Sequence, residues 1–195
     1  MESTEKTKSR SQSKTKIVGL SCLFVILTLI ITGGVLTVLT QMEIIRDFET
    51  LNPDGLEGEA LVVFRPGISL FQEDMTNAFV EGLVEKDWIV NITTSSSQTP
   101  INIHDYDLLV LGTPTYGGTP HHSIVSYLKN VGDLNGIDII LIITSGGSDQ
   151  ALDIMTSKVQ NNNGTIIESL SLYTIKDNGG NARDLSYNSG KNLNL

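Results

Sequence analysis

An uncharged stretch of 26 residues, from Ile17 to Met42, is the feature that most constrains this chain. It exceeds the roughly 20 apolar residues that a helix needs to cross a bilayer. A buried core helix rarely stays free of charge over this length, and the apolar region of a cleavable signal peptide is shorter, at about 7–15 residues. The sequence therefore predicts a single transmembrane helix over residues 17–42.

Basic residues on the two sides of this stretch predict its orientation. The basic residues of the preceding tail, residues 1–16, are Lys6, Lys8, Arg10, Lys14 and Lys16. The flank that follows has one nearby basic residue, Arg46, among several acidic ones. Basic residues resist translocation, so we expect a cytoplasmic tail and an extracytoplasmic domain on a single-pass membrane protein. The opposite orientation stays open, because the argument depends on few charges.

The composition of residues 43–195 restricts the classes of partner. This part keeps 8 of the 13 basic and 20 of the 22 acidic residues, a net charge near −12. Such a surface repels the nucleic-acid backbone, so no nucleic-acid partner is expected, whereas a basic redox or membrane-protein partner is possible. The single cysteine, Cys22, lies in the apolar stretch, so the domain has no disulfide and no cysteine-based metal site. The adjacent His121 and His122 are interpreted as polar residues of a first helical turn, and no metal is predicted.

Strands and helices alternate along the rest of the chain. Residues 43–58 are predicted to be a juxtamembrane stalk, in which Ile45 and Phe48 continue the helix briefly before a turn at Asn52-Pro-Asp-Gly55. The predicted strands are residues 60–64, 88–92, 107–112, 138–144 and 165–173. The predicted helices begin near Leu70, with a capping box at Ser69-Leu-Phe-Gln72, at Thr119-Pro120, at Asp149 and near Ala182. This order predicts one α/β domain over residues 59–195, a three-layer, doubly wound parallel sheet with helices on both faces.

Three loops at the carboxyl ends of these strands form the candidate binding site. Ligands of such sheets bind beyond this edge, and small residues that lead into a helix let backbone N–H groups approach an anion. The loops are residues 65–71, 112–118 and 144–149, and all three are rich in Gly, Ser, Thr or Pro. The candidate ligand-binding residues are Arg65, Pro66, Gly67, Ile68, Ser69, Thr113, Pro114, Thr115, Tyr116, Gly117, Ser145, Gly146 and Gly147.

The second loop carries a resemblance to a known family. The run Tyr106-Asp-Leu-Leu-Val-Leu-Gly112-Thr-Pro-Thr-Tyr116-Gly-Gly, followed by Pro120 and Tyr127-Leu128, resembles the third strand and loop of flavodoxin-like proteins. Ile139 to Gly147 is similar to their fourth strand and its loop. The resemblance covers residues 59–194 and implies a five-stranded parallel sheet in the order 2-1-3-4-5. It also implies FMN as cofactor, with its phosphate on the first loop and its ring between the second and third, in an electron carrier rather than a hydrolase or transferase.

The first loop departs from the family pattern. Where the family has a Thr-Gly-Asn-Thr core, this chain has Ser69-Leu-Phe-Gln72. Most hydroxyl donors are therefore missing, although Arg65 could offset them through a charge-assisted contact. Arg65 is interpreted either as an anion contact or as a surface charge. Tyr116 is interpreted either as a stacking partner of the ring or as a residue that closes a turn.

Two functions therefore remain open. One is a membrane-anchored FMN-binding electron-transfer module, and the other is a flavodoxin-fold binding or scaffolding domain that has lost the flavin. The chain lacks the Gly-x-Ser-x-Gly elbow of α/β-hydrolases and a Gly-x-Gly-x-x-Gly fingerprint after its first strand. Arg65 and Gly112 also stand where a response-regulator receiver needs acidic residues.

Overall fold

The computed structural model describes residues 20–35, 37, 38 and 41–195, and the chain divides into two compact units, residues 1–42 and 43–195. In the first unit, residues 20–35 are helical with exposed side chains. No helix within the described residues combines the length and the apolar character needed to cross a bilayer. The transmembrane segment predicted over residues 17–42 includes 17–19, 36, 39 and 40, which lie outside the described residues, and it stays a prediction.

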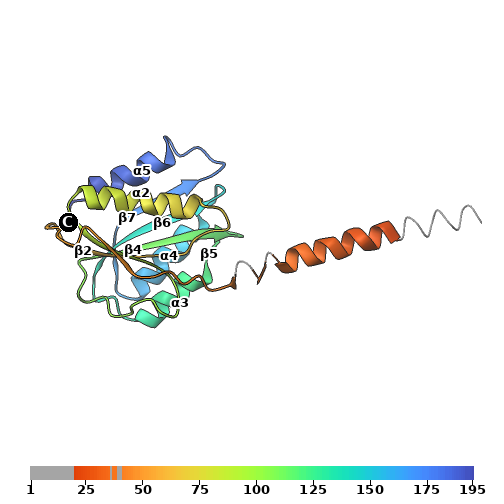
Figure 1. Cartoon of the computed structure of the whole chain (residues 1–195), viewed down its shortest axis with the longest axis horizontal. Helices are drawn as coiled ribbons and strands as arrows, with labels where there is room; N and C mark the ends of the chain where they lie inside the picture. Colours follow the sequence, from red (N-terminus) through yellow and green to blue (C-terminus); the bar gives the residue numbers. More distant parts are fainter. Residues whose placement is uncertain (1–19, 36, 39–40) are drawn as a thin grey trace, which may run out of the picture. The chain divides into compact units, whose positions relative to one another are not determined.

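The second unit is an α/β domain (Figure 1). Its elements in chain order are β1 (Glu49–Leu51), β2 (Glu59–Phe64), α2 (Phe71–Glu85), β3 (Ile89–Thr94), β4 (Leu108–Tyr116), β5 (Thr119–Pro120), α3 (His122–Val131), β6 (Asp138–Ser145), α4 (Gln150–Asn161), β7 (Thr165–Tyr173) and α5 (Ala182–Lys191).

The sheet has seven strands in place of the five that were predicted. Strands β3-β2-β4-β6-β7 are parallel neighbours in this order, which is 2-1-3-4-5 when these five are numbered along the chain. Two short antiparallel strands are added, β1 beside β3 and β5 beside β4. The carboxyl ends of the five parallel strands therefore share one edge of the sheet.

Strand β1 corrects the prediction that the helix continues through Ile45 and Phe48. Neither residue is helical, and the chain enters β1 at Glu49. An edge strand such as β3 offers a row of unpaired backbone groups, which a neighbouring segment can satisfy. Thr50 stands opposite Asn91, and its Oγ1 donates to Asn91 Oδ1 at 2.5 Å. The tertiary pairing thus overrides the helical spacing of the apolar residues.

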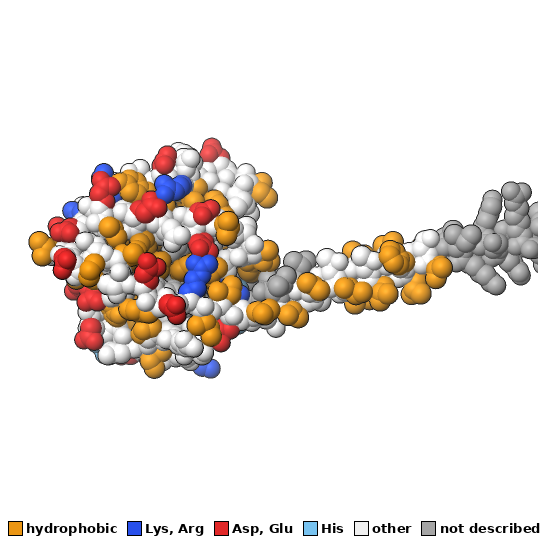
Figure 2. All heavy atoms as spheres, viewed as in Figure 1, with side chains coloured by type: hydrophobic (Ala, Val, Ile, Leu, Met, Phe, Trp, Pro, Cys, Tyr) orange, Lys and Arg blue, Asp and Glu red, His pale blue; other side chains and the backbone are white. Residues whose placement is uncertain are grey.

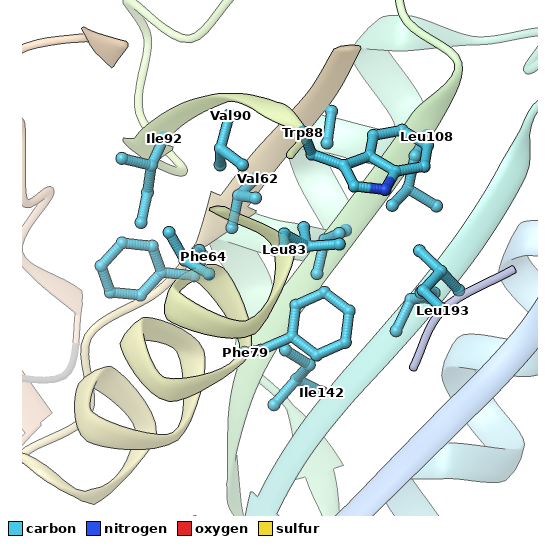
Figure 3. Packing of buried hydrophobic residues seen from close by; sticks show 14 of the residues in the cluster. Val62, Phe64, Phe79, Leu83, Trp88, Val90, Ile92, Leu108, Ile142 and Leu193 are labelled. Carbon is cyan, nitrogen blue, oxygen red and sulfur yellow. The ribbon is translucent and has the colours of Figure 1, made fainter. Parts of the chain in front are cut away.

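Helices cover both faces of the sheet. Helices α2 and α5 lie on one side in Figure 1, with α3 on the other. One buried cluster joins α2 and α5 to the sheet, and Figure 3 shows Phe79 and Leu83 of α2 packed over Val62 and Ile142. A second cluster joins α3 and α4 to the opposite face. Side chains of the central strands alternate between the two clusters, so the strands are apolar throughout.

One predicted helix start and one predicted helix cap are wrong. Thr119-Pro120 is strand β5, because Gly117 and Gly118 have φ of 58° and 81° and turn the chain back as a two-residue hairpin. Helix α3 begins at His122, and the His121 side chain caps it by accepting the Ser123 N–H. No capping box starts α2, whose N-cap is Leu70 without a side-chain hydrogen bond, because Gln72 is buried in other contacts.

Candidate functional site

The three predicted loops meet at one cavity of about 240 Å³ at the carboxyl edge of the sheet. Its lining residues are Gly67, Ile68, Ser69, Phe71, Gln72, Pro114, Thr115, Tyr116, Thr144, Ser145, Gly146 and Thr174. Gly67, Tyr116 and Gly146 are far apart in sequence and come together because β2, β4 and β6 are parallel neighbours. The fold thus builds one concave surface from residues of all three loops.

Five of the predicted residues do not line this cavity: Arg65, Pro66, Thr113, Gly117 and Gly147. Thr113 is buried beneath the start of α3, where its Oγ1 accepts the His121 N–H at 2.9 Å. Gly117 lies in the exposed turn between β4 and β5, and Gly147 lies in the exposed loop after β6. Contact of all thirteen predicted residues with a ligand stays a prediction.

The floor of the cavity contains residues that the sequence analysis missed. Gln72 is buried, its Oε1 accepts from Thr144 Oγ1 at 2.7 Å, and its Nε2 donates to Thr76 Oγ1 at 3.1 Å. These side chains are bonded to one another, so they give the floor a fixed shape and leave few donors for a ligand. Their positions follow from helix α2 packing on β6, which the spacing within either element does not reveal.

Thr174 was also missed, although the topology contains a signal for it. Strand β7 is parallel to β6, so the loop that follows β7 reaches the same edge of the sheet. This loop bonds to the third predicted loop: the Thr174 N–H donates to Ser145 O at 3.0 Å, and the Lys176 N–H donates to Gly146 O at 3.3 Å. The loop after β7 is therefore a fourth loop of the same site.

A hydrogen bond joins the first loop to the second. The Ile68 N–H donates to Tyr116 Oη at 2.8 Å, so the phenol of the second loop reaches the backbone of the first. A Cβ added at Gly67 would lie 3.1 Å from Ser69 O and 3.6 Å from Tyr116 Oη, and glycine allows this close approach. The bond occupies one of the backbone donors that the first loop could offer to an anion.

The third loop is held by its own side chains. Ser145 Oγ accepts the N–H groups of Gly147 and Ser148, both at 3.1 Å, and donates to Ser148 O at 2.9 Å. At the rim, hydrogen bonds from Tyr173 and then Lys176 hold the pKa of Asp149 below its usual range. The loop is therefore held in one conformation before any ligand enters. The Asp149 carboxylate at its rim is paired with the Lys176 ammonium group.

Arg65 is a charged residue of the first loop with an unusual environment. Its side chain is buried, with 2% exposure, and its Nε and Nη1 atoms have no hydrogen-bond partner. Burial lowers the pKa of its guanidinium, while a weaker interaction with Tyr116 opposes that shift. Arg65 is therefore no surface charge, which removes one of the two interpretations drawn from the sequence.

The two ends of an FMN molecule fit this site unequally. Small residues and Tyr116 around the second and third loops leave a shaped opening suited to a flat ring. At the phosphate end, Ser69 is the hydroxyl residue of the first loop, and the first turn of α2 carries the acidic Glu73 and Asp74. Acidic residues in a first helical turn weaken anion binding there. The ring end therefore fits, whereas the phosphate end has few of the usual donors.

Acidic side chains outnumber basic ones on the surface of the domain. Figure 2 shows acidic groups spread over the visible face of the domain, with fewer basic ones among them. Two of the basic groups, Arg46 and Arg183, pair with Glu73 and Glu81. The domain therefore presents net negative charge to whatever approaches it.

The class of protein follows from this architecture: a doubly wound parallel sheet with strand-end loops around one cavity is the flavodoxin-like fold. No protein-family model and no curated protein matches the sequence. Among solved structures, the two-electron reduced flavodoxin of Megasphaera elsdenii is similar, with a TM-score of 0.58 and 20% identity over 68% of this chain and 98% of that one.

Two further flavodoxins give the same result. A Streptococcus pneumonia flavodoxin has a TM-score of 0.58 and 13% identity, over 68% of this chain and 95% of that one. A flavodoxin from the domain Archaea has a TM-score of 0.55 and 13% identity, over 68% of this chain and 96% of that one. Each is covered almost completely, so this chain contains the whole flavodoxin-like fold and carries additional residues besides it.

Proposed function

We propose that this protein is a membrane-anchored, flavin-binding electron-transfer module with FMN as its cofactor. The observation that supports the proposal most directly is the convergence of the strand-end loops on one cavity in a flavodoxin-like fold. Bound there, the isoalloxazine would supply the redox chemistry, and the protein would supply its orientation and electrostatics. The partner would be a basic redox or membrane protein that complements the acidic surface.

Different residues of the cavity would contact different parts of the bound flavin. Pro114, Thr115 and Tyr116 would flank one side of the ring, with Ser145 and Gly146 on the other. The self-bonded loop at Ser145 would hold its backbone in place without an ordering cost on binding. The bonded pair Gln72 and Thr144 would close the floor and exclude water from the buried side.

The anchor is part of the same proposal. Its support is the uncharged run of residues 17–42 and the basic tail before it, which favour a cytoplasmic N-terminus and a domain outside the membrane. Protease treatment of sealed vesicles that carry the full chain tests the orientation. Digestion of the domain from outside in right-side-out vesicles supports it, and protection of the domain overturns it.

The absorption spectrum of the purified full chain in detergent tests flavin binding. Absorption in the blue, or quenching of FMN fluorescence on titration, is the expected result. Gly146→Phe should abolish binding, because its Cβ has room, with Ile175 Cδ1 at 3.6 Å, and its ring would fill the cavity. The matched control is Gly180→Phe, whose Cβ has similar room beside Leu185 and which does not line the cavity. A colourless protein with unquenched FMN rejects the proposal.

One observation favours a second candidate, a binding or scaffolding domain that has lost the flavin. The Tyr116 phenol is bonded to the first loop, and the bulky Leu70 and Phe71 stand where the family carries Gly and Asn. The same titration separates the two candidates. If FMN, riboflavin and lumiflavin all fail to bind the folded protein, the scaffolding function is the one to pursue.

A further inference from the structure

Two Asn-x-Thr triplets occur in the domain, Asn91-Ile-Thr93 and Asn163-Gly-Thr165. Such a triplet is the acceptor motif for N-linked glycosylation of proteins that face the outside of the cell. Short motifs of this kind also arise by chance, so the triplet alone does not assign a site. A folded domain can be modified only where both the asparagine amide and the threonine hydroxyl are accessible.

The first triplet is enclosed by the sheet. Asn91 is 4% exposed and Thr93 is 5% exposed, on strand β3 between β1 and β2. Both ends of the Asn91 amide are bonded: Oδ1 accepts from Thr50 Oγ1 at 2.5 Å, and Nδ2 donates to Glu59 Oε1 at 2.6 Å. Thr93 Oγ1 donates to Arg46 O at 3.3 Å. A glycan on Asn91 would break these bonds and displace β1, so the folded domain excludes it.

The second triplet occupies the turn between α4 and β7, and both Asn163 and Thr165 are exposed. Asn163 has a φ of 64°, in the left-handed region that asparagine adopts more readily than most residues. Its N–H donates to Gln160 O at 3.1 Å, and its carbonyl oxygen accepts the Gly136 N–H at 2.7 Å. The backbone of the turn is therefore held in place, while the asparagine itself is open to solvent.

The middle residue of this triplet, Gly164, faces the core. A Cβ added at Gly164 would lie 2.6 to 2.8 Å from side-chain atoms of three core residues, Leu134, Ile139 and Val159. Asn163 and Thr165 are exposed on either side of this packed position, so both face outward. An enzyme that approaches from solvent can therefore contact the amide and the hydroxyl together.

The second triplet is also remote from the candidate site. Thr165 begins β7, whereas Thr174, which lines the cavity, directly follows the end of this strand. Strand β7 is the last of the sheet on its side, and no strand pairs with its outer edge in the part of the chain that the structure describes. A bulky group on Asn163 would therefore leave the cavity open and would meet no neighbouring strand.

We propose that Asn163 is an N-glycosylation site of the folded domain and that Asn91 is not. The sugar donor would be a lipid-linked oligosaccharide. The Asn163 amide nitrogen would bond to the anomeric carbon of the sugar as the bond from that carbon to the lipid phosphate breaks. The phosphate would leave with the bonding electron pair, and the amide would lose one proton. The inference rests on the extracytoplasmic orientation of the proposed function.

The full chain, expressed in a eukaryotic host, tests the inference. Its gel mobility is compared before and after a peptide N-glycosidase, which converts a glycosylated asparagine to an aspartate that mass spectrometry locates. We expect one glycan, on Asn163. Thr165→Val, which suits a strand but lacks the hydroxyl, should abolish the mobility shift, and Thr165→Ser should retain it. The matched control is Thr93→Val, which disrupts the other triplet and should leave the shift unchanged.

A reporter separates this inference from the proposed orientation. The chain is extended after the exposed Leu195 by a flexible Asn-Ser-Thr tag, which is accessible whatever the fold does. If the tag is glycosylated and Asn163 is not, the orientation stands and the inference is overturned. If neither is glycosylated, both are rejected. A glycan on Asn91 of the folded protein overturns the inference, and a glycan on Asn163 supports both.

Discussion

At the carboxyl ends of the strands, the two faces of the sheet differ in how their buried polar groups are hydrogen-bonded. On the α2 face, Gln72 and Thr144 are bonded to each other and to their neighbours. On the α3 face, Arg65 and Thr115 contain buried polar atoms without partners. A satisfied network stabilises the folded state, whereas an unsatisfied one lowers its stability and leaves binding free energy for a ligand. The comparison therefore separates a face whose buried polar groups satisfy one another from a face on which two residues keep unsatisfied polar atoms.

The largest expected effect comes from Gly190→Ala on the α2/α5 side. A Cβ there would collide with the Phe79 carbonyl oxygen and lie 3.0 Å from Leu83 N, and backbone atoms cannot move aside cheaply. We expect a loss of about 3 kcal/mol in the free energy of unfolding. Urea unfolding followed by the fluorescence of Trp88, the single tryptophan and a buried one, measures it.

Gly146→Ala is the control for this change, since its Cβ would meet only ordinary contact with Ile175. It should stay within about 0.5 kcal/mol of the wild type. A Gly190→Ala variant as stable as this control would show that α2 and α5 can separate without loss.

Gln72→Leu should have the next largest effect. The substitution keeps the side-chain volume roughly constant but leaves the Thr144 hydroxyl without its acceptor in a buried position. We expect a destabilisation of about 2 kcal/mol by the same unfolding measurement. Gln150→Leu, at the exposed first residue of α4, is the control and should change little. If both variants unfold alike, the network at Gln72 contributes nothing beyond its packing.

A matched pair of threonine substitutions tests the comparison directly. Thr144→Val removes a bonded hydroxyl and should cost about 1 kcal/mol. Thr115→Val removes a buried hydroxyl that has no partner, so its stability should be unchanged or slightly higher. The urea midpoints of the two variants show whether each substitution lowers or raises the stability. An equal loss in both would mean that Thr115 is satisfied in solution, and the difference between the two faces would disappear.

The smallest effect concerns the exposed pair of Arg46 and Glu73, whose atoms lie 2.7 and 2.8 Å apart. The hydrogen bond from Arg46 is the main cause of the lowered pKa of the Glu73 carboxyl, whose ordinary value is 4.5. A lowered folded-state pKa stabilises the protein above the unfolded value, and this contribution is lost as the pH falls through the folded value.

Glu73→Gln should therefore cost about 0.5 kcal/mol at neutral pH. Its difference from the wild type should be constant above pH 5 and shrink below about pH 4.5. Unfolding curves of both proteins across this range check the sign. A difference that grows on acidification would contradict the assignment.

Much of the fold could be predicted because its signals are local. The central parallel strands appear as short apolar runs, such as Ala60–Phe64 and Asp138–Thr144, which is the pattern expected of a strand buried on both faces. Their alternation with amphipathic helices then restricts the topology to a few arrangements. Residues 49–51 and 119–120 were not predicted as strands. A strand of two or three residues is too short to show an alternating pattern, and it forms only because it pairs with a neighbouring strand.

The candidate site was predictable in outline and not in its contacts. Parallel topology alone brings Gly67, Tyr116 and Gly146 to one cavity. The bond between Tyr116 and Ile68, and that between Gln72 and Thr144, join residues about 50 and 70 positions apart. No local rule relates such residues, since their distance depends on how α2 and the loops pack on the finished sheet.

The sequence by itself determined the charge of this protein, its apolar N-terminal run, the number of parallel strands and the edge at which a ligand would bind, because each depends on residue type and period along the chain. The tertiary structure alone decided that Arg65 is buried and unpaired while Gln72 is buried and bonded. Arg65 begins the first loop and Gln72 lies in the first turn of α2, and only the three-dimensional packing brings hydrogen-bond partners to Gln72 while Arg65 Nε and Nη1 are left without any.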